Sequence, residues 1–147
     1  MPEYEYQNVE AWNTTIKLAA AVGRLKIGSN LKASADAQQK AFEQAGLASA
    51  LIAEGSLREG AGAVPLYRDA RGALAQCRSW LHVLAAVTNE ADSVFGNEFD
   101  LAEQASRQLG GLVRTIDRAP ATGPRPPMRG PAPSGPRPGG RPPGGPR

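Results

Sequence analysis

The feature that most limits the fold of this chain is the spacing of its apolar residues, which recur at alternating steps of three and four. This spacing places side chains on one face of an α-helix. It runs through residues 7–27, 31–58 and 65–87, and through a last segment that starts near Asn97 and ends before Pro120. Because the connections are short, an all-α, up-down-up-down four-helix bundle is predicted over residues 1–118.

Each predicted helix has an apolar face that we expect to lie in the core. The first face comprises Val9, Trp12, Ile16, Ala19 and Gly23, and the second comprises Ala41, Ala45, Ala48 and Ile52, widened by Phe42, Leu47 and Leu51. The third comprises Ala70, Leu74, Cys77, Leu81, Leu84 and Val87, beside Trp80 and Val83, and the fourth comprises Ala102, Ala105, Leu109, Leu112 and Ile116. Aromatic residues make up only 5% of the chain, which also favours helix over sheet.

The last 29 residues, 119–147, have a different composition, with 11 prolines and 7 glycines. Such a segment buries too little apolar surface to offset the entropy of ordering it, so a disordered tail with polyproline II character is predicted. Two roles are open: a solubilising tail, or a salt-sensitive contact with RNA or another polyanion. The second role would use the arginines of the tail, which are Arg125, Arg129, Arg137, Arg141 and Arg147.

The net charge of +3 belongs to that tail, which carries five arginines and no acid. Residues 1–118 carry 12 lysines and arginines against 14 acids, a net charge of −2. A lone cysteine, Cys77, fits a reducing cytoplasm. The acidic start is unlike a signal peptide, and no apolar run reaches the roughly 18 residues of a membrane span, so a cytoplasmic protein without membrane attachment is expected.

Few residues suit catalysis. The one histidine, His82, stands three residues after Ser79, without an acid nearby in sequence to complete a nucleophilic triad. A di-iron bundle needs two Glu-x-x-His pairs, and zinc needs more ligands than one histidine and one cysteine. We therefore expect no catalytic residue, metal or cofactor, with His82 on a helix surface and Cys77 filling space in the core.

Two basic stripes follow from helical spacing. Arg71, Arg78 and His82 share a face of the third predicted helix, flanked by Arg68, and Arg107, Arg114 and Arg118 share a face of the fourth. They are either ordinary solvated faces or a surface that contacts phosphates or docks an acidic partner.

The stretch "LIAEGS" places Glu54 and Gly55 near the end of the second predicted helix. In an antiparallel hairpin Glu54 can face Arg71, so a structural ion pair between them is predicted. Gly55 is expected to permit close helix approach or a local bend.

Several segments resemble a known superfamily. "VEAWNTTIKLAAAV" is similar to the opening of the small four-helix-bundle proteins encoded by intervening sequences within bacterial 23S rRNA genes. "LIAEGS" resembles their Asn-Ile-Ala-Glu-Gly signature, with Leu51 in place of the usual Asn. "ARGALAQ" resembles their Ala-Arg-Gly-Ser-Leu-x-Glu segment. The matching residues are Val9, Trp12, Ile52, Ala53, Glu54, Gly55, Ala70, Arg71, Gly72 and Leu74.

A related branch is the accessory variability determinant of diversity-generating retroelements. "LYRDARGALAQCRSWLHVLA" and "RQLGGLVRTIDR" resemble it, through Leu66, Tyr67, Arg78, Trp80, Leu81, Leu84, Leu109, Gly110 and Gly111. This resemblance implies a non-enzymatic homopentameric barrel that binds the reverse transcriptase and its RNA, or an RNA–DNA hybrid. The alternative is a self-assembling bundle of the intervening-sequence type, with a structural or protein-interaction role and no RNA partner.

Overall fold

The computed structural model describes residues 4–118 of the chain. Four long helices, and no strand, occur in that range: α1 (Glu10–Gly23), α2 (Lys32–Ser56), α3 (Val64–Val87) and α4 (Gly96–Arg118). Short 3-10 helices precede α1, α3 and α4, namely η1 (Glu5–Asn8), η2 (Gly60–Ala63) and η3 (Asp92–Phe95). The all-helical prediction is confirmed for these residues. The predicted tail, 119–147, with all five of its arginines, lies outside them.

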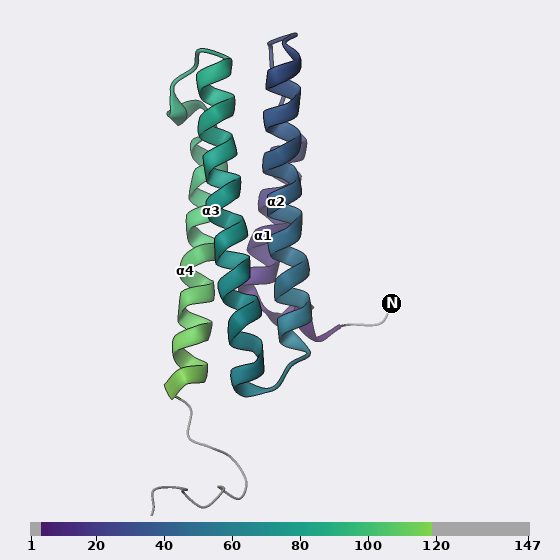
Figure 1. Ribbon diagram of the computed structural model, residues 1–147, viewed down its shortest axis with the longest axis vertical. Coiled ribbons are helices and arrows are strands. Elements are labelled where there is room, and N and C mark those ends of the chain that lie inside the picture. Colours follow the sequence, from purple (N-terminus) through teal and green to yellow (C-terminus); the bar gives the residue numbers. More distant parts are fainter. Residues whose placement is uncertain (1–3, 119–147) are drawn as a thin grey trace, which may run out of the picture.

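The long helices lie side by side in one elongated bundle (Figure 1). Each packs against two others, in the pairs α1–α2, α2–α3, α3–α4 and α1–α4. The α1–α2 and α3–α4 connections lie at one end of the molecule, and the α2–α3 connection lies at the other (Figure 1). Arginines on α3 and α4 therefore belong to neighbouring helices.

Helix ends differ from the prediction where short 3-10 helices take up the chain. Residue Gln7 belongs to η1, and α1 ends at Gly23 rather than at Ile27. Asn97 was expected to precede the fourth helix but lies inside α4, because η3 continues directly into it through a helical Gly96. Pro65 lies in the first turn of α3, where its missing N–H costs nothing.

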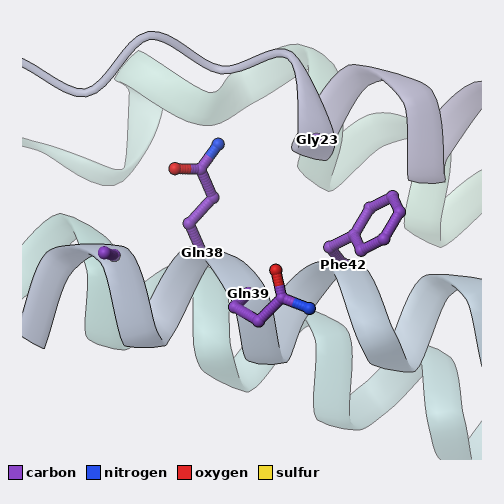
Figure 2. A pocket seen from close by; sticks show the side chains of 5 residues that line it. Gly23, Gln38, Gln39 and Phe42 are labelled. Atoms are coloured by element: carbon purple, nitrogen blue, oxygen red, sulfur yellow. The ribbon is translucent and has the colours of Figure 1, made fainter.

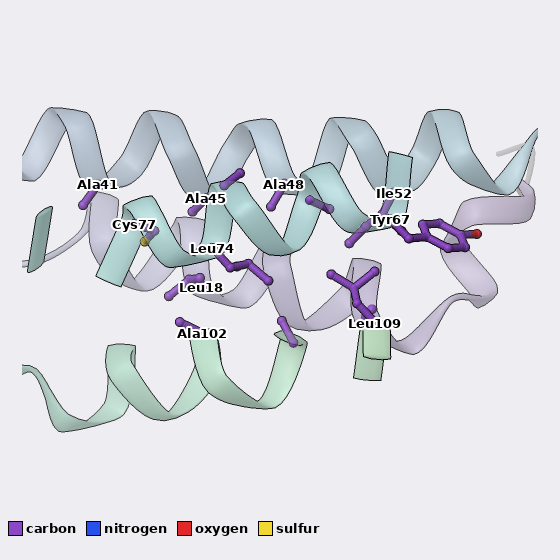
Figure 3. Packing of buried hydrophobic residues seen from close by; sticks show 14 of the residues in the cluster. Leu18, Ala41, Ala45, Ala48, Ile52, Tyr67, Leu74, Cys77, Ala102 and Leu109 are labelled. Carbon is purple, nitrogen blue, oxygen red and sulfur yellow. The ribbon is translucent and has the colours of Figure 1, made fainter. Parts of the chain in front are cut away.

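The core packs a row of alanines on α2 against leucines and smaller residues of the other helices (Figure 3). The α2 face consists of Ala41, Ala45, Ala48 and Ile52, all fully buried as predicted. Opposite them lie Leu74 and Cys77 of α3, Leu18 of α1, and Ala102 and Leu109 of α4, also fully buried. Alanine side chains let neighbouring helices approach closely, so the leucines fill the remaining space.

The core face predicted for α1 is wrong, because a different face of this helix is buried. Ala11, Leu18 and Val22 are fully buried, whereas Ile16 is 40% exposed. Of the remaining predicted residues, Val9, Trp12 and Ala19 are only partly buried, and Gly23 is exposed. The buried face also carries two threonines, which disguise it in the sequence.

Those threonines are buried because their hydroxyls have partners. Thr14 Oγ1 donates to Glu10 O at 3.1 Å and lies 2.7 Å from Gln108 Oε1 of α4, and Thr15 Oγ1 donates to Trp12 O at 2.7 Å. A buried hydroxyl that is hydrogen-bonded costs little. Polar residues consequently occupy a face that a hydropathy pattern assigns to solvent.

Two of the residues expected to widen the α2 face lie at the surface instead. Phe42 is 41% exposed and Leu47 is 45% exposed, whereas Leu51 is partly buried. On α3, Val83 is 39% exposed. These side chains leave apolar surface on both sides of α2.

Candidate anion-binding site

Two of the predicted basic residues meet between α3 and α4. The Nη1 atoms of Arg71, from α3, and Arg114, from α4, lie 3.5 Å and 3.4 Å from the position that a Cβ on Gly110 would occupy. The Arg71 Nε donates to Ser106 Oγ at 3.4 Å. The two guanidinium groups thus lie over the same part of the α4 backbone, at Gly110, and we call this pair the Arg71–Arg114 centre.

Acids neutralise several of the other predicted basic residues. Arg107 pairs with Glu103 at 3.1 Å and Arg68 approaches Asp117 at 4.0 Å. Within residues 4–118, no carboxylate lies within 4.0 Å of the guanidinium nitrogens of Arg71 or Arg114. The centre therefore keeps two uncompensated positive charges.

The remaining residues of the two stripes do not join this centre. Arg78 lies two turns further along α3, and Arg118 is the last described residue of α4. No hydrogen bond or ion pair links either of them to Arg71 or Arg114 in the described part of the chain. The full stripes as one binding surface stay a prediction.

His82 lies at the surface, as predicted, with a partner that the sequence did not reveal. Its Nδ1 lies 3.1 Å from Asp92 Oδ2, and its ring packs on Phe99 with centroids 4.6 Å apart. Asp92 comes ten residues later, from η3. Among the described residues, Ser79 makes no hydrogen bond to His82, so no nucleophile–base pair forms.

The predicted ion pair between Glu54 and Arg71 is replaced by two other contacts. Glu54 Oε2 accepts a hydrogen bond from Arg58 Nη2 at 2.7 Å, one turn along the same helix. Arg71 instead reaches across to Ser106 on α4. Arg58 is favoured because an i,i+4 neighbour meets Glu54 on the solvent side without bringing it toward the core.

Gly55 allows a residue of α3 to pack closely on α2, as predicted. A Cβ at this position would lie only 2.6 Å from Cε1 of Tyr67. The ring of Tyr67 therefore packs directly on the backbone of α2, and Gly55 is buried.

Cys77 is fully buried in the core, where burial raises the pKa of its thiol to about 12, against a smaller opposing effect of Arg78. The thiolate is the reactive form of cysteine. This environment suits a space-filling residue, as the sequence indicated.

Shallow hollows lie in the grooves on either side of α2. The α1–α2 hollow, of about 360 Å³, is shown in Figure 2, where Phe42 extends toward Gly23. The Gln38 amide donates to Val22 O and Leu25 O, at 2.9 and 3.0 Å. No ionisable side chain lines this hollow.

The α2–α3 groove contains two hollows. One, of about 560 Å³, is lined by Trp80, Val83 and Val87 together with α2 residues from Ala33 to Glu43. The other, of about 420 Å³, lies nearer the α2–α3 connection, beside Leu47 and Leu51. Neither hollow includes Arg71 or Arg114, both of which are exposed at the surface.

Metal-binding clusters and membrane-spanning helices are absent from the described residues. Within 4–118, no three or more His, Cys, Asp or Glu side chains gather in a way that could hold a metal ion. None of the described helices combines the length and apolarity needed to cross a bilayer.

Sequence reasoning identified Arg71 and Arg114 but missed what brings them together. Ser106 and Gly110 complete the centre, and Gly110 had been noted only through a family resemblance. Comparison with family models, with curated proteins and with solved structures found no match to this chain.

Proposed function

We propose that this protein is a non-enzymatic accessory protein of a diversity-generating retroelement. In this proposal the chain forms a homopentameric barrel that binds the reverse transcriptase and its RNA, or an RNA–DNA hybrid, in the cytoplasm. The resemblance of residues 66–85 and 107–118 to that branch supplies the partner and the subunit number. The observation that carries the proposal is the Arg71–Arg114 centre, which offers unpaired positive charge on an open surface.

The scaffold in this proposal is an up-down-up-down bundle. Support comes from the short connections, which lie at alternate ends of the molecule (Figure 1). Such an order places α3 and α4 antiparallel, so that a residue near the start of α3 meets one near the end of α4. The meeting of Arg71 with Arg114 agrees with this order.

Self-assembly in this proposal uses the apolar surface on both sides of α2. Phe42, which lines the α1–α2 hollow, is about two-fifths exposed, and so is Ile16 of α1. Leu47 and Val83, which line the α2–α3 hollows, are exposed to a similar extent. A cyclic assembly joins one face of a subunit to a different face of the next. Two distinct apolar faces are what a closed ring requires, and a neighbouring copy of the chain is the proposed occupant.

The second candidate is a self-assembling bundle of the intervening-sequence type without an RNA partner. It is favoured by the net charge of −2 over residues 1–118. It is also favoured by the pairing of Arg68, Arg107 and His82 with acids, which leaves fewer of the predicted basic residues free to contact phosphate.

A pull-down with the full-length chain separates the two candidates. Copurification of a reverse transcriptase and its RNA supports the first, and recovery of the assembly alone supports the second. RNA affinity is then measured from low to high salt. Binding through phosphates weakens steeply as salt rises, so an affinity that is independent of salt would contradict a phosphate contact. Sedimentation that shows a monomer would remove the pentamer.

A further inference from the structure

We infer that Arg71 and Arg114 together hold a single phosphate group above Gly110, and that this group belongs to a polynucleotide backbone. The site rests on the geometry between α3 and α4, whereas the identity of the ligand as RNA rests on the proposed function. The ligand chemistry is a phosphoryl oxygen, which free phosphate shares.

Two like charges, the guanidinium groups of Arg71 and Arg114, converge near Gly110. Both guanidinium groups come within 3.5 Å of one point above Gly110, from two different helices. Like charges at short range repel, and no carboxylate within residues 4–118 compensates for them. An anion placed between them removes this repulsion and gains attraction to both.

The N–H and O–H donors of the centre suit the oxygens of a phosphate group. Guanidinium groups present several N–H donors in a planar fork, and this fork suits phosphate oxygens. Ser106 adds a hydroxyl beside Arg71; its oxygen accepts from Arg71 Nε at 3.4 Å, and its own proton remains free to donate. One phosphate thus meets donors from both helices.

Gly110, which is buried in α4, lies directly beneath the two guanidinium groups. A Cβ on this residue would touch the Nη1 atoms of both arginines, at 3.4 and 3.5 Å. These are ordinary contact distances, so a side chain longer than a methyl group would compete for the space that the guanidinium groups occupy. Glycine therefore lets both groups lie close over the backbone of α4.

The exposed position of the two arginines favours one kind of phosphate ligand. Neither arginine lines any of the hollows beside α2, and both arginines are exposed to solvent. A small metabolite is usually enclosed by a concave pocket that contacts most of its surface. An open pair of arginines instead contacts a backbone phosphate and positions the strand without reading its sequence.

The test uses the full-length chain and the variants Arg71→Gln and Arg114→Gln. Arg107→Gln serves as the matched control, since it removes the same charge from α4 at a residue already paired with Glu103. Two probes are titrated: inorganic phosphate, followed by calorimetry, and a single-stranded RNA homopolymer, followed by filter binding at several salt concentrations. Circular dichroism verifies that each variant is folded.

We expect each of the two variants to weaken binding of the RNA about tenfold and to reduce the salt slope by about one, because each removes one charge-assisted contact. Arg107→Gln is expected to change affinity less than about twofold. The same pattern with inorganic phosphate identifies a site that takes the free anion as well. If phosphate binds with this pattern and RNA does not bind, the site stands and the proposed RNA partner fails.

Two results would overturn the inference. One is equal affinity of the wild type, Arg71→Gln and Arg114→Gln for both probes. The other is an equal loss in Arg107→Gln, which would show that only the total charge matters. RNA binding that survives these results leaves the proposed function intact and places its contacts elsewhere on the chain. A further variant, Gly110→Leu, keeps both charges but fills the space between them, and is expected to weaken binding about as much as losing one arginine.

Discussion

The aromatic ring of Tyr67 packs on the backbone of Gly55, at a point where a Cβ on residue 55 would lie 2.6 Å from the ring. The contact joins the end of α2 to the beginning of α3. Both residues are buried. No side chain other than hydrogen fits at position 55 without moving the ring, so this contact explains a glycine near the end of an alanine-rich helix.

Gly55→Ala is expected to lower the free energy of unfolding by about 1–2 kcal/mol, because the cost of overpacking exceeds the gain in helix propensity. Gly46→Ala is the matched control on the same helix, since a Cβ there meets nothing within 4 Å. That variant is expected to stabilise the protein by about 0.5–1 kcal/mol. Urea unfolding measures both, and a stabilising effect of Gly55→Ala would contradict the contact with Tyr67.

Leu18→Ala and Ile16→Ala test which face of α1 is buried. Leu18 is fully buried, so its truncation leaves a cavity and is expected to cost about 2–5 kcal/mol. Ile16 is 40% exposed, and its truncation is expected to cost less than about 1 kcal/mol. Thermal or urea unfolding of the two variants distinguishes this face from the one that hydropathy indicated, for which the order of the two costs would be reversed.

A double-mutant cycle tests the partner of Glu54. Coupling between Glu54→Ala and Arg58→Ala is expected to be about 0.3–0.5 kcal/mol, the usual value for an exposed i,i+4 pair. Coupling between Glu54→Ala and Arg71→Ala is expected to be zero within error, because the structure gives them no contact. A larger coupling in the second cycle would restore the ion pair that the sequence predicted.

Cys77 predicts a dependence of stability on alkaline pH. Its pKa is raised to about 12 by burial, so between about pH 9 and 12 the folded protein keeps a proton that the unfolded chain loses. The contribution of this thiol to the free energy of unfolding is therefore fully present below about pH 9. This contribution falls by about 1.4 kcal/mol for each pH unit as the pH rises toward 12.

Urea unfolding between pH 8 and 10.5 measures this slope. Cys77→Ala serves as the control, since it removes the thiol and is expected to flatten the curve by that amount. Alkylation of the folded protein at pH 8 should also be much slower than alkylation in urea. Equal alkylation rates in the two conditions would show that Cys77 is accessible in the folded protein.

Much of the core was predictable from helical spacing. On α2, α3 and α4 a single apolar face dominates each helix, and Ala45, Leu74 and Leu109 are buried on those faces as expected. Spacing is a local property, and it survives folding when only one face of a helix can be buried.

On α1 the sequence offers two candidate faces, and spacing alone favours the one that contains Trp12 and Ile16. The choice between them depends on partners from distant parts of the chain. Thr14 is buried beside Gln108, 94 residues later, whose side-chain oxygen lies 2.7 Å from its hydroxyl. Such a contact has no signature in the local pattern.

An all-helical chain of four long segments follows from local features of the sequence, since apolar spacing, alanine content and helix-ending glycines and prolines act within a few residues of one another. Which charges meet depends instead on the tertiary structure. It paired Glu54 with Arg58, joined His82 to Asp92, and brought Arg71 to Arg114 over Gly110. The reason is physical: a side chain's partner depends on where neighbouring helices place their surfaces, and that placement is set by packing of the whole core.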